Sequence, residues 1–196
     1  MSTRESTRTR LLDAADELLF ADGDVHAPVD RILERAGVSP ATLYRAYGSK
    51  DALVAAALDR RQRDWLEVWD AAVARAGTDR ERLLSVFDAH AEFQARAAGA
   101  RWCAFLGTAA GYVDPPPVLA EAVRQDTDAL RSRLRTLAEP VAGPGAARLA
   151  DALTLVFSGH LAMRLRDGSP RDEGDVAREV AALLIDQAEL ARPRER

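Results

Sequence analysis

Side chains with hydrogen-bond donors gather between residues 42 and 50 of this chain. Thr42, Tyr44 and Arg45 fall within one helical turn, and Lys50, the only lysine of the 196 residues, follows shortly after them. Hydroxyl and ammonium groups bind phosphate oxygens, and arginine can form two hydrogen bonds with the O6 and N7 acceptors of guanine. This combination predicts a surface that binds a nucleic acid.

The surrounding residues predict the element that carries these donors. Gly37 is suited to end one apolar helix, Ser39 can cap a second, and Pro40 suits the first position of that second helix. Two helices joined by a short glycine-containing turn form a helix-turn-helix. Lys50 stands at the start of the next helix, where its charge opposes the macrodipole by about 0.3–1 kcal/mol, which indicates a partner such as a phosphate.

With these residues the chain resembles the tetracycline-repressor (TetR) family of bacterial transcriptional regulators. The resemblance covers roughly residues 7–55 and rests on Gly-Val-Ser at 37–39, Thr-Leu-Tyr at 42–44, an aromatic residue at 47 and Ser-Lys at 49–50. It implies a homodimer that binds a palindromic DNA operator. Together, chemistry and resemblance assign DNA binding to Ser39, Pro40, Ala41, Thr42, Tyr44, Arg45 and Lys50.

These DNA-binding residues divide into three kinds of contact. Arg45 is the candidate for reading a base, although a solvated arginine paired with a nearby carboxylate is the alternative. Thr42 and Tyr44 suit phosphates, and Pro40 and Ala41 offer only apolar contacts, for example to thymine methyl groups.

The chain departs from the family pattern at two places. Ala46 and Tyr47 stand where relatives usually have His-Phe, and Ala27-Pro28 lacks the usual hydroxyl before the second helix. Both departures remove an expected contact with the DNA backbone. An N-terminal arm could replace them by reaching phosphates or the minor groove with Arg4, Arg8 and Arg10.

The acidic net charge does not exclude DNA binding, and the cysteine content fits the cytoplasm. The net charge is −4, yet residues 1–63 hold ten basic and ten acidic side chains, so the acidity belongs to the remainder. A single cysteine excludes an intrachain disulfide and fits a reducing compartment. The sequence contains no apolar stretch of about 20 residues and no secretory signal, so we expect no membrane helix and a cytoplasmic location.

Helical periodicity runs through the whole chain, which predicts an all-α fold with no sheet. We expect a three-helix DNA-binding domain at residues 1–50 and a six-helix regulatory domain, for ligand binding and dimerisation, at residues 51–196. The expected helices cover about residues 7–21, 28–36, 40–47, 50–76, 79–98, 101–112, 116–139, 144–167 and 173–192.

Large aromatic residues of the second part predict an apolar ligand pocket, since these helices enclose the ligand cavity in the family that the chain resembles. Simple core packing is the alternative for each of them, and His90 and His160 are likewise core histidines or ligand contacts. We expect a small neutral or singly charged, apolar or amphipathic effector, because burying more charge is costly. The expected pocket residues are Trp65, Trp69, Phe87, Phe105 and Phe157.

The last two expected helices carry apolar residues at spacings of three and four. In the family these helices pair across a two-fold axis as a four-helix bundle. The expected dimer interface therefore includes Leu153, Phe157, Val180 and Leu184.

The sequence contains no catalytic or metal-binding constellation. It has no cysteine or histidine pair at metal-ligand spacing, no nucleophile elbow and no phosphate-binding glycine loop. We therefore expect no enzyme activity, no metal and no cofactor, and predict a ligand-responsive transcriptional regulator, a repressor. Two alternatives are a helix-turn-helix regulator controlled by a protein partner or by its abundance, and a helical enzyme or ligand carrier without DNA function.

Overall fold

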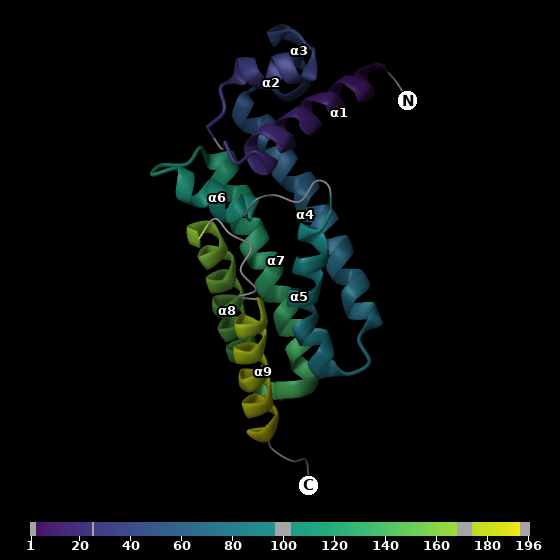
Figure 1. Cartoon of the computed structure of the whole chain (residues 1–196), viewed down its shortest axis with the longest axis vertical. Helices are drawn as coiled ribbons and strands as arrows, with labels where there is room; N and C mark the ends of the chain where they lie inside the picture. Colours follow the sequence, from purple (N-terminus) through teal and green to yellow (C-terminus); the bar gives the residue numbers. More distant parts are fainter. Residues whose placement is uncertain (1–2, 25, 97–102, 168–173, 193–196) are drawn as a thin grey trace. The chain divides into compact units, whose positions relative to one another are not determined.

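Helices form every regular element in the computed structural model, which describes all residues except 1–2, 25, 97–102, 168–173 and 193–196. This confirms the all-α prediction (Figure 1). The bounds are α1 Thr3–Asp16, α2 Val29–Ala36, α3 Pro40–Tyr47, α4 Lys50–Arg75, α5 Asp79–Gln94, α6 Ala104–Gly111, α7 Pro117–Ala142, α8 Ala146–Asp167 and α9 Gly174–Leu190.

The chain forms two compact units. The first unit comprises residues 1–64 and 94–125, and the second unit comprises residues 65–93 and 126–196. The long helices α4 and α7 each contribute residues to both units. The boundary expected at residue 50 stays a prediction about function, since compactness alone does not define a DNA-binding domain.

The first unit has a core built by one apolar stripe from each of its helices. Leu11 of α1, Ile32 of α2, Leu43 of α3 and Leu53 of α4 are fully buried within it. These residues recur on one side of each helix, as the 3.6-residue period requires. The tight packing orients the opposite side of α3 toward solvent.

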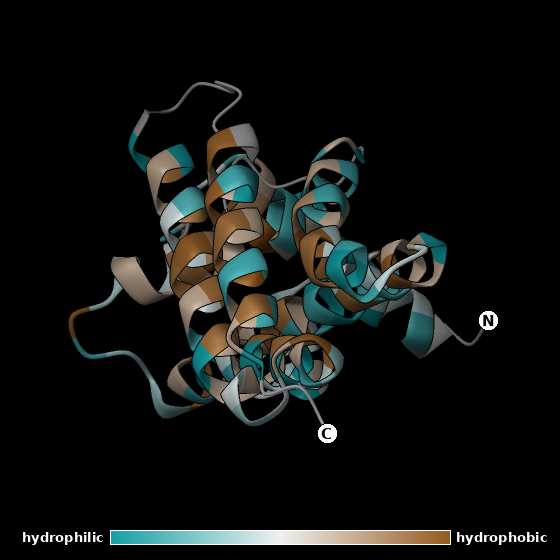
Figure 2. Cartoon of the chain, turned by 90° about the horizontal axis from the view of Figure 1, so that it is seen from below, coloured by the Kyte–Doolittle hydropathy of each residue, from teal (hydrophilic) through white to brown (hydrophobic). Residues whose placement is uncertain are grey.

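The second unit has a separate core around Trp69 and Leu134, which are fully buried. Helices α5, α8 and α9 complete it with apolar residues that include Leu83, Leu153 and Ile185. Figure 2 shows hydrophobic and hydrophilic residues alternating along the helices of the chain, as expected when each helix buries only one side.

Several helix ends differ from the predicted ones. α1 begins at Thr3 and continues into a π-helical turn over Glu17–Ala21, which no local pattern indicated. α5 ends at Gln94, since Ala95 and Arg96 form a turn and a bend where helix was predicted, and residues 97–98 lie outside the described part. α7 continues through Pro140 to Ala142, where a break was predicted. A proline this close to a helix end removes a single hydrogen bond, and the Arg192 side chain binds its carbonyl.

Candidate nucleic-acid interface

The turn between α2 and α3 has the geometry of a glycine-terminated helix. Gly37 adopts φ 63° and ψ 42°, a left-handed conformation that favours glycine. Its N–H donates to the carbonyl of Glu34 at 3.1 Å, and the Val38 N–H donates to that of Leu33 at 3.1 Å. These bonds end α2 sharply, and α3 begins after a turn of three residues, 37–39, which confirms the predicted helix-turn-helix.

The serines flanking α3 act differently from the prediction. Ser39 is the N-cap residue, but its side chain forms no capping bond, and its hydroxyl lies 2.9 Å from the Thr42 hydroxyl. The capping serine is Ser49, whose Oγ accepts a hydrogen bond from the Ala52 N–H at 3.0 Å. α4 therefore begins at Lys50, as predicted, with a cap that was overlooked.

The outer side of α3 presents the predicted DNA-binding residues. Leu43 anchors the helix in the core, while Tyr44 is 54% exposed and Arg45 is exposed. Arg45 has no hydrogen bond or ion pair within the described part of the chain, so the alternative of a paired surface arginine gains no support there. The remaining predicted contacts lie on the same helix and its flanks: Ser39, Pro40 and Ala41 are exposed, and Thr42 and Lys50 are half-buried.

Two N-terminal arginines of α1 bind residues of the helix-turn-helix, whereas we expected them on a free arm that reaches DNA. Arg8 donates to the Ala46 carbonyl at 3.1 Å and lies over the Tyr47 ring at 4.8 Å, while the Tyr47 hydroxyl donates to the Arg8 carbonyl at 3.2 Å. Arg10 donates to the Ala36 carbonyl at 3.3 Å. Burial raises the pKa of Tyr47, which stays a neutral donor. The side chain of Arg4 lies outside the described residues.

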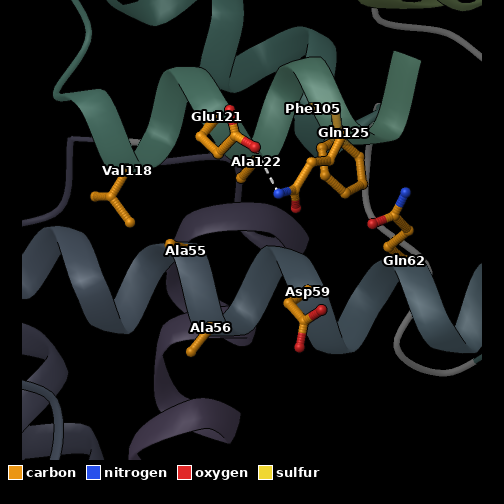
Figure 3. Close-up of a pocket in the computed structure, with 9 residues that line it drawn as sticks. All are labelled: Ala55, Ala56, Asp59, Gln62, Phe105, Val118, Glu121, Ala122 and Gln125. Atoms are coloured by element: carbon orange, nitrogen blue, oxygen red, sulfur yellow. Dashed lines mark hydrogen bonds between the residues drawn. The ribbon is translucent and has the colours of Figure 1, made fainter. Parts of the chain in front are cut away.

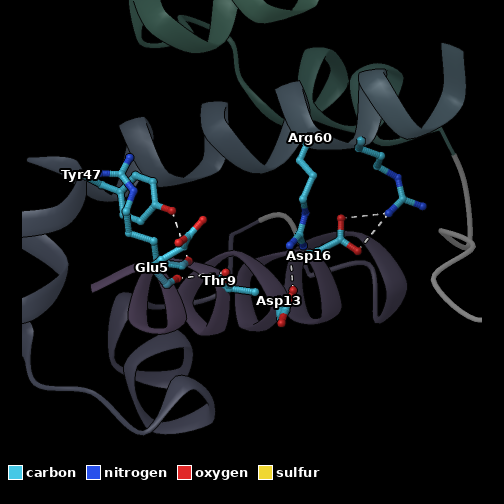
Figure 4. A network of polar contacts seen from close by, with 8 residues as sticks. Glu5, Thr9, Asp13, Asp16, Tyr47 and Arg60 are labelled. Atoms are coloured by element: carbon cyan, nitrogen blue, oxygen red, sulfur yellow. Dashed lines mark hydrogen bonds and ion pairs between the residues drawn. The ribbon is translucent and has the colours of Figure 1, made fainter. Parts of the chain in front are cut away.

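Two ion pairs join α1 to α4 (Figure 4). Arg61 binds both carboxylate oxygens of Asp16 at 2.9 and 3.1 Å, and the two side chains are only 6% and 14% exposed. Arg60 binds Asp13 at 2.7 Å. Because these partners are 45 and 47 residues apart, sequence reasoning found no signal for them.

The second unit brings together four of the five predicted pocket residues. The rings of Trp65 and Phe157 stack at 6.1 Å with an interplanar angle of 16°. Phe87 meets Phe157 edge-on at 5.6 Å, and Trp69 lies 5.6 Å from Trp65. The fifth residue, Phe105, belongs to the first unit and is not part of this aromatic cluster.

Phe105 instead lines a cavity of about 310 Å³ in the first unit (Figure 3). Its polar lining includes Asp59 of α4 and Glu121 of α7. The Glu121 carboxylate accepts hydrogen bonds from Arg124 and Gln125, both at 2.6 Å. These bonds lower its pKa, and the one from Arg124 has the larger effect. The cavity is therefore lined by carboxylates that already have partners along their own helices, as Asp59 has in Arg63.

The predicted dimer residues divide by burial. Leu153 and Phe157 are 2% and 4% exposed inside the second unit, so they cannot form a surface between subunits without unfolding it. Leu184 is half-buried against the same core, and Val180 is exposed. Apart from Val180, the exposed apolar side chains of α8 and α9 were not among the predicted interface residues. These exposed residues are Leu155, Met163, Val176, Val180 and Leu183.

Within the described residues, no helix is both long and apolar enough to cross a membrane. The same residues contain no group of three or more His, Cys, Asp or Glu side chains placed to hold a metal ion.

Comparison with known proteins identifies the helix-turn-helix. Residues 11–57 match the model of "Bacterial regulatory proteins, tetR family". The regulator BetI of Brucella anthropi is 34% identical over 79 residues, which are 40% of this chain and 41% of BetI. The alignment thus spans about two fifths of that relative's length.

Two solved structures match nearly the whole chain. A TetR-family transcriptional regulator from Streptomyces coelicolor is 26% identical with a TM-score of 0.76, and 95% of each chain is covered. A protein from Streptomyces avermitilis, described as a TetR transcriptional regulator, is 30% identical with a TM-score of 0.78. The match covers 93% of this chain and 98% of the Streptomyces avermitilis protein.

The fold is all-α with an N-terminal helix-turn-helix, and the comparisons place the chain in a class of transcriptional regulators and not of enzymes. The chain belongs to the TetR family of transcriptional regulators.

Proposed function

We propose that this regulator is a homodimeric, effector-responsive repressor of a palindromic operator, with residues 1–50 as its DNA-binding domain and residues 51–196 as its regulatory domain. The proposal rests on the outer side of α3. Tyr44 and Arg45 are exposed there, while Leu43 of the same helix is packed in the core. A short helix held this way can enter the major groove with its polar side chains toward the bases. A repressor that binds chromosomal DNA would act in the cytoplasm, so the proposal includes a cytoplasmic location.

The proposed repression depends on the DNA-binding domains of both subunits binding the operator at the same time. Two half-sites on one face of B-DNA are about 34–36 Å apart, so both α3 helices dock only when the dimer holds them at that separation. An effector that prefers another arrangement of the dimer lowers operator affinity by its difference in affinity for the two arrangements.

The aromatic cluster of the second unit supports a small, largely apolar effector. Trp65 and Phe157 offer ring faces, and Phe87 offers an edge. The direct contacts among these rings also favour a second candidate function, a regulator whose core needs no effector and which responds to a protein partner or to its own abundance.

Selection of bound DNA from a random-sequence library tests the proposal. The full-length protein should enrich two inverted half-sites whose centres lie about 10 base pairs, or a multiple of that, apart. Unselective recovery of DNA would contradict operator recognition, and a single half-site would contradict the dimer.

The selected operator then separates the two candidates. Small apolar compounds that quench tryptophan fluorescence and raise the melting temperature should also weaken operator binding, because by linkage an effector that prefers the DNA-free arrangement lowers the affinity for DNA. Compounds that bind without changing operator affinity would favour the second candidate.

A further inference from the structure

Two buried imidazoles interrupt the aromatic cluster of the second unit. His90 of α5 and His160 of α8 are each 7% exposed, and their rings meet edge-on at 5.3 Å with an interplanar angle of 86°. His90 also lies 5.6 Å from Phe157 and 6.5 Å from Trp65. The cluster therefore contains polar groups among rings that could otherwise form an apolar core.

The same place holds buried polar atoms that lack a partner. The Nδ1 atom of His160 and the Nε atom of Arg164 are both inaccessible, and neither has a hydrogen bond among the described residues. Residues 160 and 164 are four apart on α8 and thus share a side of that helix. Buried polar atoms are normally hydrogen-bonded, so these two atoms on one side of a helix are hydrogen-bonding groups that a ligand could use.

The charge beside His90 and His160 is positive. Burial, followed by repulsion from His160 and Arg164, lowers the pKa of His90 to about 3. Burial and Arg164 also lower the pKa of His160. Both imidazoles are therefore neutral at neutral pH, and the charge that acts on them is the Arg164 guanidinium. Arg164 forms no ion pair with any described residue, so this charge is left without a counter-ion there.

We propose that His160 and Arg164 bind the carboxylate of an organic monocarboxylic acid whose apolar body lies against Trp65, Phe87 and Phe157. Arginine donates charge-assisted hydrogen bonds to carboxylates, and a neutral imidazole adds one donor in the tautomer that carries hydrogen on Nδ1. This inference rests on the proposed function, since it names the chemical class of the effector.

The alternatives fit the cluster less well. An amine would bring a second positive charge beside Arg164, and a neutral compound would leave the guanidinium without a counter-ion. A multiply charged anion would retain buried charge that the single guanidinium cannot balance. A water molecule could satisfy His160 but would not neutralise Arg164.

Matched probes test the head group separately from the apolar body. Benzoic, 2-naphthoic and decanoic acid, each with its primary amide and the corresponding primary amine, are titrated against the full-length protein by tryptophan fluorescence and thermal shift. At least one acid should bind about 10-fold to 100-fold more tightly than its amide, the range expected for hydrogen bonds to a charged group. The amines should bind most weakly.

Substitutions on α8 test whether His160 and Arg164 cause the preference for the acid over its amide. Arg164→Gln should bring the acid-to-amide ratio of affinities close to one, and His160→Leu should reduce it by a smaller factor. Arg166→Gln is the matched control, because Arg166 is an exposed arginine two residues further along the same helix. It should keep the wild-type ratio.

The outcomes separate this inference from the proposed function. If no acid binds at millimolar concentration, if the amides bind as tightly as the acids, or if Arg164→Gln keeps the preference, the carboxylate site is wrong. If an acid binds through Arg164 yet leaves operator affinity unchanged, the site stands and the proposed effector-controlled repression fails.

Discussion

On α3, one buried residue determines what its neighbours present to solvent. Leu43 is fully buried, and a helix turns by about 100° per residue, so Tyr44 and Arg45 project away from the core. Leu43 packs in the same core as Leu53 and Ile32. A helix held this firmly fixes the position of the Arg45 backbone, from which the side chain can reach a base edge.

Replacement of Arg45 tests base recognition. Arg45→Ala should cost about 1–3 kcal/mol of binding free energy on the selected operator and relax base preference at one position per half-site. Fluorescence anisotropy with the operator and its single-base variants measures both effects. Unchanged affinity and preference would show that Arg45 does not read a base.

Lys50→Ala is the companion variant, because Lys50 is predicted to bind a phosphate at the start of α4. It should weaken binding to all DNA sequences about equally. The slope of log affinity against log salt concentration should decrease by about one per protomer. A sequence-dependent loss would instead place Lys50 at a base.

His90 should make stability depend on pH. Its folded pKa is about 3 because of burial and the neighbouring His160 and Arg164, against an ordinary value of 6.5. Between these two values the unfolded chain binds a proton that the folded chain does not, so the free energy of unfolding decreases as the pH falls. The slope reaches about 1.4 kcal/mol per pH unit. His90→Gln should lose this contribution and gain stability relative to wild type on acidification.

Urea unfolding at a series of pH values from neutral to about pH 5 measures the difference. His26→Gln, which changes an exposed imidazole, serves as the control and should follow wild type. Parallel curves for His90→Gln and wild type would show that the imidazole of His90 is not held neutral.

At the scale of elements, the helices near the DNA-binding motif were the most predictable. Gly37, Pro40 and Lys50 mark ends of α2, α3 and α4 by local rules, and the structure has those ends where they were predicted. Each of these signals lies within a few residues of the end that it marks, so the sequence alone is sufficient.

Features that depend on distant partners could not be predicted in the same way. The side chain of Arg8 lies over the ring of Tyr47, and the Tyr47 hydroxyl donates to the Arg8 carbonyl, 39 residues away. The exposed and buried sides of α9 depend on how α8 packs against it. Sequence periodicity therefore identified both helices as apolar but chose Leu153, which is buried, for the dimer interface.

The buried ion pair between α1 and α4 should be a strong attachment of the two helices. In Arg61→Met the Asp16 carboxylate, 14% exposed, loses its bidentate partner. Loss of one partner of a buried pair costs about 3–5 kcal/mol of unfolding free energy. Arg63→Met is the matched control on the same helix. It removes an exposed pair with Asp59 and should cost no more than about 1 kcal/mol.

Chemical denaturation followed by circular dichroism compares the two variants. The double variant Arg61→Met, Asp16→Leu should recover much of the lost stability, since no buried charge is then left alone. Equal losses in Arg61→Met and Arg63→Met would show that this pair does not fasten α1 to α4.

At the scale of the whole molecule, the second unit exposes apolar side chains that would suit a partner. Val176, Val180 and Leu183 follow one another on α9 at spacings of four and three, so they lie on one side of that helix. Leu155 and Met163 are exposed on α8. Exposed apolar residues gathered on two adjacent helices are typical of a protein interface, and a two-fold axis would let the same surface pair with itself.

Leu183→Glu tests this surface. Leu183 is 64% exposed, so glutamate costs the folded subunit little, whereas the half-buried Leu184 would confuse dimerisation with folding. Wild type should sediment as a dimer at micromolar concentration and Leu183→Glu as a monomer with an intact circular dichroism spectrum. Operator affinity should fall by about 100-fold or more, because the second half-site no longer benefits from the effective concentration that the dimer provides. Val113→Glu, at an exposed valine of the first unit, should remain dimeric and bind the operator normally. A wild-type monomer, or a Leu183→Glu protein that stays dimeric, would exclude α9 as the dimer surface.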